Sequence, residues 1–451
     1  MMKKRQPTGN DWTMNNTLHE GVATFLLSMY TNRVVIVLLL LVFGAAAAFV
    51  TPSLPSLPSS TSPWKGRSNK QSVTVGGEEE VGGGKKVVHC YVLAHGFVGG
   101  EHDLVYLRKA ILEQAAQHAA ATKRVRTVAL CADCNEGKTF DGVRHGGERL
   151  ASYIKDALTD IIMEEVTEDN SKPVVKLSVV GNSLGGLYAR YAVRSLFLQG
   201  HLTLSKYNVQ VEPATFATTA SPWLGIASNT YLPLPRFMES AIGWTLSKTG
   251  KDLCRNSKIV YDMATQEEFL VPLLKFERRI AMANCYSTDF LVGQNTGLFL
   301  DSKNDTPHTP ASVKSFSQTE MIKEAYTTEK TYKGTTAPPS TSVDADNVIA
   351  SRSLDSLGWL KIAVDVRKTL PSLPRLRFKS TSSDLEGALT SAELRKRWGA
   401  ASSDRVVLPN GHNMIVANQG KPGYEKAFKH GRPIMDSLAK LLVQGAPGES
   451  S

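Results

Sequence analysis

The chain has 451 residues, of which 42% are hydrophobic and 21% charged, fractions that exclude a wholly disordered, collagenous or coiled-coil protein. Half of its net charge of +10 lies in residues 1–75, which hold seven basic and two acidic side chains. The rest is only mildly basic and shows no cationic stripe, which argues against a nucleic-acid-binding protein, while its length is sufficient for a large enzyme domain.

The chain begins with a polar, basic region, residues 1–33, followed by the uncharged apolar run Val34–Val50. Seventeen residues lie at the lower edge of a bilayer span and slightly above the apolar part of a signal peptide. We therefore expect either a transmembrane anchor or a cleaved signal. Residues 51–86 follow as a Ser/Pro/Gly-rich linker, and up to Val75 they are basic and free of acids, as in transit peptides.

This leader resembles the bipartite leaders that direct proteins into the secondary plastids of algae. The resemblance rests on Ala48-Phe49 at the end of the apolar run and on the Ser-rich basic stretch after it. Two features depart from the pattern, the long region before the run and Val50-Thr51-Pro52 in place of the usual Ala-Pro. A plastid protein and a membrane-associated protein on a stalk are thus the two alternatives for location.

From Val87 onward, short apolar runs alternate with helix-length segments, and we place a folded domain at residues 87–446. Strands are expected at 87–93, 125–130 and 174–180, and helices at 104–121, 146–163 and 184–198. This alternation predicts an α/β fold, a mostly parallel sheet with helices on both faces.

The five cysteines are too few and too irregular for a disulfide framework, so reduced thiols are expected. Cys131 and Cys134 form a Cys-x-x-Cys, but no second pair of ligands stands at a spacing suited to zinc. The sequence predicts neither a metal site nor an organic cofactor.

A Gly-x-Ser-x-Gly motif, Gly181 to Gly185, stands between the strand at 174–180 and the helix at 184–198. Such a motif is common by chance, but this position is that of a nucleophile elbow. The serine of an elbow occupies a strained turn, and glycines beside it let neighbouring backbones approach. Ser183 is the predicted nucleophile, with Gly181 and Gly185 as the elbow glycines.

An elbow also needs an oxyanion hole, two N–H groups that bind the negative oxygen of the intermediate. One donor is the residue after the nucleophile, here Leu184, and the other lies in the loop after an earlier strand. Residues 94–100 (AHGFVGG) form that loop, and Phe97 is the predicted second donor. His95 is expected to order the loop rather than to act as a base.

A serine nucleophile requires a histidine base that is oriented by a carboxylate, in the chain order serine, acid, histidine. Four histidines follow Ser183, at positions 201, 308, 412 and 430. His412 is the predicted base because it lies at a tip, Asn410 to Asn413, after an expected strand at 406–409.

Asp289 is the predicted acid, because it follows an expected strand at 281–286. Asp301 and Asp365 remain alternatives.

Several stretches together coincide with one family pattern. They are residues 94–97, 135–139, 141–149, 181–190, 218–225, 282–284 with Asp289, and 411–413. On these motifs the chain resembles, over about Val87 to Asn418, the lipase-like serine esterases first catalogued as domain of unknown function 676. The resemblance implies an α/β-hydrolase fold with Ser183, Asp289 and His412 as the triad.

The chain departs from that family at three places. Asn182 replaces the common histidine beside the nucleophile, and Trp223 replaces the histidine of the Ser-Pro-His-Leu-Gly stretch, departures that bear on substrate fit. Residues 302–347 form a polar, Thr/Ser/Pro-rich insertion, which we expect to be a disordered loop.

The expected activity is hydrolysis of carboxylic esters through an acyl-enzyme. Residues 226–249 are apolar and suited either to a cap that admits acyl chains or to a helix packed on the core. With the leader and the lipase-like resemblance, this favours lipid esters at a membrane surface. The alternatives are an esterase, thioesterase or amidase for a soluble substrate, and an inactive binding protein. The sequence does not determine head group, acyl length or oligomeric state.

Overall fold

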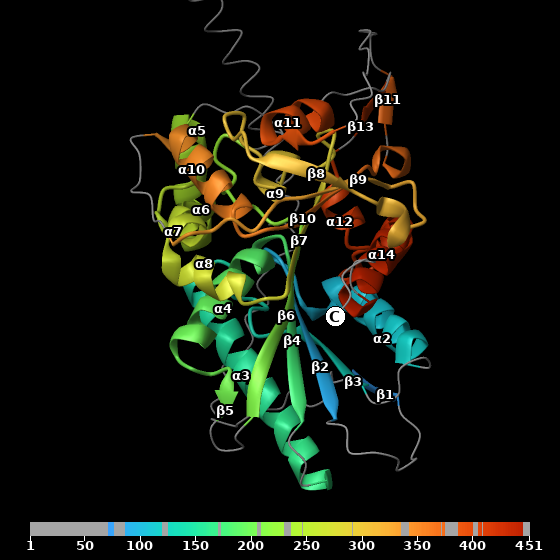
Figure 1. Ribbon diagram of the computed structural model, residues 1–451. Helices are drawn as coiled ribbons and strands as arrows, with labels where there is room; N and C mark the ends of the chain where they lie inside the picture. Colours follow the sequence, from blue (N-terminus) through green and yellow to red (C-terminus); the bar gives the residue numbers. More distant parts are fainter. Residues whose placement is uncertain are drawn as a thin grey trace, which may run out of the picture. The chain divides into compact units, whose positions relative to one another are not determined.

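Figure 1 shows the computed structural model of the protein, whose described residues belong to one compact unit within Gly66–Ser451. The structure describes residues 71–75, 86–119, 125–169, 173–204, 209–229, 236–245, 247–290, 292–334, 342–370, 372–374, 387–399, 405–407 and 409–444. The apolar run Val34–Val50, residues 1–33 and most of the predicted linker lie outside these ranges. No helix within them is long and apolar enough to cross a membrane.

Eleven of the described strands form one sheet in the order β1-β3-β2-β4-β6-β7-β10-β9-β8-β12, with β5 paired to β6. Its parallel part comprises β3 (Val125–Ala132), β2 (Val87–Ala94), β4 (Val174–Asn182), β6 (Val209–Thr219), β7 (Arg278–Asn284) and β10 (Leu360–Val364). The antiparallel strands are β1 (Gln71–Val75), β5 (Thr203–Leu204), β8 (Pro307–Ala311), β9 (Ile322–Thr327) and β12 (Leu389–Thr390). The predicted mostly parallel sheet is confirmed.

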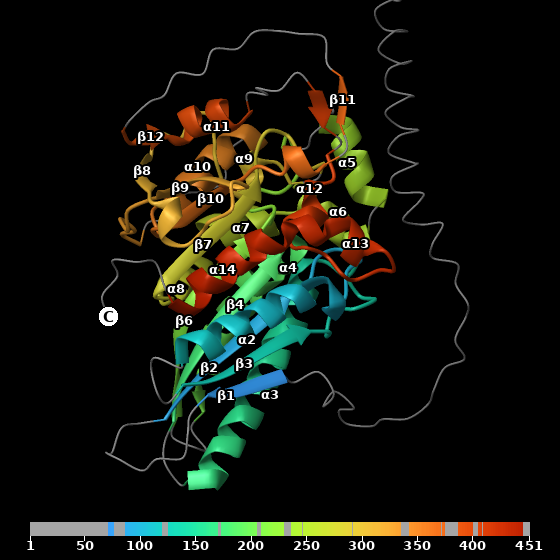
Figure 2. The ribbon, with the colours of Figure 1, turned by 90° about the vertical axis from the view of Figure 1, so that its right-hand side faces the viewer.

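Helices cover both faces of this sheet (Figures 1 and 2). On one face α2 (Val105–Ala119) packs against α14 (Arg432–Gln444), and on the other α3 (Val143–Asp169) packs against α4 (Leu184–Leu198), beside α8 (Glu267–Leu274). Each face buries its own apolar cluster. Because helices cover both faces of the sheet, the parallel strands are nearly continuous apolar runs in the sequence rather than alternating apolar and polar residues.

Shorter helices complete the described part of the fold. They are α5 (Arg236–Thr245), α6 (Ser247–Leu253), α7 (Ile259–Thr265), α9 (Gln294–Gly297), α10 (Val343–Asp355), α11 (Ser391–Gly399), α12 (Gly411–Met414) and α13 (Tyr424–Phe428). Four 3-10 helices are η2 (Glu101–Leu104), η3 (Val313–Ser315), η4 (Arg367–Thr369) and η5 (Lys429–Gly431).

The order of the parallel strands determines where the loops meet. The chain leaves β2 for β3 on one side and then crosses back to β4 on the other, so β2 and β4 are neighbours at a topological switch point. In open α/β sheets, ligands bind outside the carboxyl ends of the strands at such a point. The loops that follow β2 and β4 therefore flank the expected site.

Residues 302–347 differ from the disordered loop that their polar composition predicts. Their described part contains β8, β9 and the start of α10, and β9 pairs with β10 in the main sheet. A buried charge cluster holds these elements: Asp355 of α10 lies 2.5 Å from the Lys361 ammonium of β10, and Asn304 donates to the same carboxylate. Pairing and a buried ion pair thus order a segment whose average composition is polar.

Candidate active site

Ser183 occupies the sharp turn between β4 and α4. Its φ of 55° and ψ of −127° are outside the regions that residues with a side chain usually adopt, as in a nucleophile elbow. The turn is held on both sides, because the Ser183 N–H donates to the Thr219 carbonyl at 2.8 Å and the Gly186 N–H to the Ser183 carbonyl at 3.0 Å. The strand, turn and helix predicted from the motif are present.

The two elbow glycines are required for space. A Cβ atom at Gly181 would lie 2.4 Å from Gly186 Cα, and one at Gly185 would lie 2.2 Å from the Ala94 carbonyl oxygen. The missing side chain at Gly181 lets the elbow close, and the missing side chain at Gly185 lets the start of α4 pack against the end of β2. Any side chain at these positions would force the backbones apart.

The loop after β2 lies directly beside the nucleophile. A Cβ atom at Gly96 would be 2.8 Å from Ser183 Cβ, so the backbone of the oxyanion loop, which we define as residues 94–100, passes against the serine side chain. The N–H groups of Phe97 and Leu184 have no hydrogen-bond acceptor within the described parts of the chain. Both predicted donors are therefore available to a ligand near Ser183.

His95 contacts the backbone of the oxyanion loop. Its Nδ1 donates to the Gly96 carbonyl at 3.0 Å, and its side chain is buried. This hydrogen bond fits the expected ordering of the loop.

Asp289 and His412 form a hydrogen-bonded pair. The His412 Nδ1 donates to the Asp289 Oδ2 at 2.8 Å, and the carboxylate is 1% exposed. The same carboxylate accepts from the Val292 N–H at 2.9 Å and from the Asn284 amide at 3.2 Å. Because the carboxylate fixes the proton on Nδ1, the other ring nitrogen is left to accept a proton.

Backbone pairing brings these distant segments together. The Gly411 N–H donates to the Thr288 carbonyl at 2.7 Å, and the Phe290 N–H to the Pro409 carbonyl at 3.1 Å. The strand expected before His412 is β13 (Arg405–Val407), but it pairs with β11 (Ser372–Pro374) in a separate two-stranded sheet. The last parallel strand before His412 is β10. His412 itself lies in the short helix α12, so it does not directly follow a strand of the main sheet.

Two opposing effects act on the pKa of His412. Burial lowers it, whereas the negative charge and hydrogen bond of Asp289 raise it, and the charge of Asp103 raises it further. The net result is a pKa above the usual value for histidine. The imidazolium form is therefore stabilised at this position.

Ser183 and His412 are not hydrogen-bonded to each other within the described residues. In serine hydrolases without substrate this bond is often long and closes only in the complex. The structure contains the elbow, the oxyanion loop and the Asp289–His412 pair.

The other acidic and histidine candidates have different partners. Asp365 is engaged by Arg367 at 2.7 Å, Asp301 accepts from the Lys303 N–H, and His430 is exposed. His308 is fully buried, and desolvation together with the charge of Lys361 lowers its pKa to about 3. Geometry thus favours Asp289 and His412.

Asn182 and Trp223, the two residues at which the chain departs from the family motifs, have buried side chains. The Asn182 side chain is buried and accepts from the Thr219 hydroxyl at 2.9 Å. Trp223 is fully buried and packs against Trp359, with the Arg190 guanidinium 4.2 Å from its ring centre. Both residues support the core beneath the elbow.

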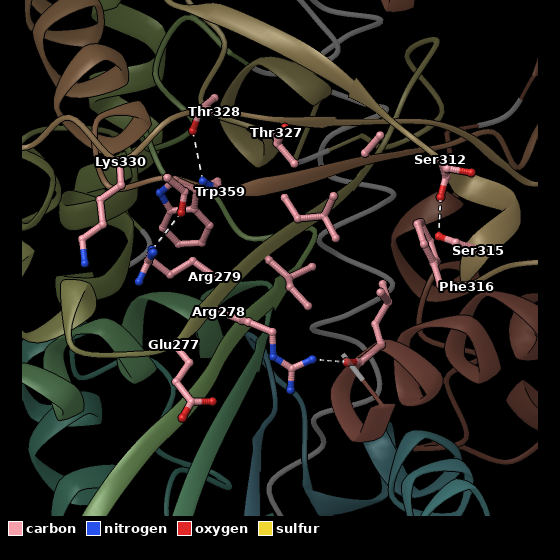
Figure 3. A pocket seen from close by; sticks show the side chains of 15 residues that line it. Glu277, Arg278, Arg279, Ser312, Ser315, Phe316, Thr327, Thr328, Lys330 and Trp359 are labelled. Atoms are coloured by element: carbon pink, nitrogen blue, oxygen red, sulfur yellow. Dashed lines mark hydrogen bonds between the residues drawn. The ribbon is translucent and has the colours of Figure 1, made fainter. Parts of the chain in front are cut away.

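A hollow of about 530 Å³ lies at the opposite edge of the sheet, where β7 and β10 begin (Figure 3). Its two arginines are bonded to backbone carbonyls: Arg278 donates to Leu441 and Leu442 in the last turn of α14, and Arg279 donates to Gly358. A cation at a helix C-terminus stabilises that end. The arginines here serve to fasten elements of the fold.

Part of the chain is similar in sequence to a known family. Residues 84–296 match the family described as "Putative serine esterase (DUF676)". The resemblance drawn from the motifs is confirmed over this segment. The segment includes Ser183 and Asp289 and ends before His412.

Curated yeast proteins match about the same length of chain. "Putative lipase YDL109C" of Saccharomyces cerevisiae is 30% identical over 218 residues, which cover 47% of this chain and 31% of that protein. "Putative lipase ROG1" of the same organism is 29% identical over 48% of this chain and 30% of its own length. The chain thus spans about a third of these relatives.

Solved structures also match, at low similarity. Phospholipase PlaB from Legionella pneumophila is 13% identical, with a TM-score of 0.27, over 44% of this chain and 38% of that one. Carboxyl esterase 2 from Tuber melanosporum is 13% identical, with a TM-score of 0.27, over 53% and 78%. The α/β-hydrolase fold of this protein is evident in its own strand order and elbow.

Proposed function

We propose that this protein is a serine hydrolase that cleaves carboxylic esters through an acyl-enzyme. The observation that carries the proposal is the 2.8 Å hydrogen bond between His412 and buried Asp289, at the same edge of the sheet as the Ser183 elbow. This is the combination of nucleophile, base and orienting acid that acyl transfer needs.

Each group has one role in the proposed cycle. His412 takes the proton of Ser183, whose oxygen attacks the ester carbonyl, and Asp289 stabilises the imidazolium that forms. The Leu184 and Phe97 N–H groups bind the oxyanion. The imidazolium then protonates the leaving alcohol, and water, activated by the same base, releases the acyl group.

We further propose a lipid ester as the substrate, supported by an apolar surface beside the oxyanion loop. Phe237 and Trp244 of α5 are 74% and 62% exposed and lie seven residues apart, on one face of the helix. Exposed Phe140 joins this surface to the site, because it contacts the ring of Phe97 and bonds to Ser247 of α6. Exposed aromatic groups near a site are typical of lipid contact.

The first test is covalent labelling with a fluorophosphonate probe. We expect wild-type protein to be labelled, Ser183→Ala not to be labelled, and Ser221→Ala, which removes a buried hydroxyl next to the elbow, to be labelled normally. Ser183→Ala should also lower esterase activity by several orders of magnitude. Absence of labelling in correctly folded wild-type protein would favour an inactive binding protein.

The second test addresses the acyl group. A series of p-nitrophenyl esters from acetate to laurate should give kcat/KM values that rise with chain length, because each additional methylene is removed from water. A maximum at acetate would instead indicate a soluble ester.

A further inference from the structure

Asp103 lies between the oxyanion loop and the loop that carries His412. A Cβ atom at Gly99 would be 2.2 Å from its Oδ2, and a Cβ atom at Gly420 would be 1.9 Å from its Oδ1. The carboxylate is thus held between two backbones more than three hundred residues apart in the chain. At both positions only glycine leaves room for it.

Hydrogen bonds continue this contact to the histidine. The Gly100 N–H and the Asn418 side chain lie near the Asp103 carboxylate and lower its pKa. The Asn418 amide also donates to Asn413 Oδ1 at 3.1 Å, and its oxygen accepts from the Gly420 N–H at 2.7 Å. Asn413 directly follows His412, so the network joins the oxyanion loop to the base.

Asp103 also contributes charge at the site. His412 is faced by two carboxylates, Asp289 on the loop after β7 and Asp103 on η2. Asp103 itself is faced by His95 after β2, by Lys421 beyond α12, and by the Cys131 thiol of β3. Burial has the largest effect on Asp103 and raises the pKa of its carboxyl above the usual value, whereas the charges of His95 and Lys421 lower it.

We propose that Asp103 is a positioning residue that clasps the oxyanion loop to the His412 loop and keeps a second negative charge facing the imidazole. The proposal rests on the proposed function, because its consequence is the geometry of acyl transfer. Two parts of the site come from loops at opposite ends of the domain sequence, and a misplacement of about 1 Å between reacting groups can cost a hundredfold in rate.

Two substitutions separate the two roles. Asp103→Asn retains a side chain of the same size between Gly99 and Gly420 but removes the charge, whereas Asp103→Ala removes both. We expect Asp103→Asn to lower the pKa of His412, which moves the acidic limb of the kcat/KM profile to lower pH with little loss of rate at its plateau. Asp103→Ala should show the same displacement and a loss in kcat of about tenfold to a hundredfold. Glu101→Gln, the same charge change two residues away on η2, is the matched control and should leave the profile in place.

The His412 ring provides a readout that needs no activity. Its NMR titration, assigned by comparison with His412→Gln, should move to lower pH in Asp103→Asn and not in Glu101→Gln. If wild-type protein fails to react with the fluorophosphonate probe but this displacement is observed, the proposed function is wrong and the electrostatic part of the clasp is supported. An unmoved titration together with wild-type kcat in folded Asp103→Ala would overturn the inference.

Discussion

At the scale of single residues, the glycines of the elbow motif are needed for the space that they leave around Ser183. Gly181, Gly185 and Gly96 are positions where a Cβ atom would lie within 3 Å of a neighbour. Their absent side chains let β4, α4 and the oxyanion loop meet around Ser183. The Ser183 side chain therefore lies directly beside the backbone of the oxyanion loop, at the turn that the motif forms.

The Asp289–His412 pair leads to a pH prediction. The base must be neutral to take the serine proton, and Asp289 and Asp103 raise its pKa above the usual 6.5. Activity should therefore be lost as the pH falls through a midpoint above 6.5. Asp289→Asn should lower kcat by about 10⁴-fold, as loss of an orienting acid does in serine hydrolases generally, and move the midpoint to lower pH. Measured pH profiles of kcat/KM check both effects, and a midpoint that is the same in both proteins would contradict this assignment.

Sequence reasoning located the motif residues because chain order in this fold restricts the candidates. It could not find Asp103, whose role depends on a meeting with Asn418 and Gly420 that no local pattern records. The strand it expected before His412 is present as β13, but the sequence did not indicate that this strand lies in a small separate sheet. Three apolar residues at 406–408 indicate a strand but contain no information on its partner.

At the scale of elements, the apolar face of α5 is expected to bind lipid surfaces. Phe237 and Trp244 would leave water together, and Lys248 and Lys251 nearby suit an anionic surface; the Lys251 ammonium lies 3.8 Å from the centre of the Trp244 ring. Burying two aromatic side chains contributes about 1.5–3 kcal/mol each. Replacing both with serine should therefore weaken binding by about a hundredfold to ten-thousandfold.

Vesicle co-sedimentation measures this binding. We expect stronger binding to phosphatidylcholine vesicles that contain phosphatidylglycerol than to phosphatidylcholine alone. Leu198→Ser, which alters an equally exposed apolar residue at the far end of α4, is the matched control. Wild-type binding by the double variant would exclude α5 as the contact, and hydrolysis of a short soluble ester should be unchanged in all three proteins.

The six elements expected between Val87 and Leu198 are present, because each combines a long apolar run or a helical period with clear boundaries. The segment at 302–347 was missed for a physical reason. β8 and β9 are short strands at the antiparallel side of the sheet, where only one face needs apolar residues, and their order depends on pairing with β10. The average composition of the segment gives no indication of the buried ion pair between Asp355 and Lys361.

At the scale of the whole molecule, the strand order explains how a site can be assembled from such distant residues. The loops after β2, β4 and β7 and the segment after β10 all open at the carboxyl edge of one sheet. Ser183, Asp289 and His412 come in the chain order that this topology requires. The insertion at residues 302–347 and the shorter helices add to the fold around this edge.

Two histidines, partly buried His89 and fully buried His308, are expected to make the stability of the domain sensitive to acid. Burial, together with the charges of Arg278 and Lys176, lowers the pKa of His89 to about 3, and burial together with the charge of Lys361 lowers that of His308 to about 3. Between pH 6.5 and pH 3 the unfolded chain therefore binds protons that the folded chain does not. The free energy of unfolding should decrease as pH falls through this window, by up to about 1.4 kcal/mol per pH unit for each proton.

Urea denaturation at pH 7.5, 6.0 and 5.0, followed by tryptophan fluorescence, tests this dependence. His89→Gln and His308→Gln remove one titrating group each and should reduce the slope of stability against pH, even where they lower stability at pH 7.5. His430→Gln alters an exposed histidine and should retain the wild-type slope. Equal slopes in all four proteins would show that these two rings do not control acid unfolding, and would point instead to carboxylates with a lowered pKa, such as Asp365 beside Arg367.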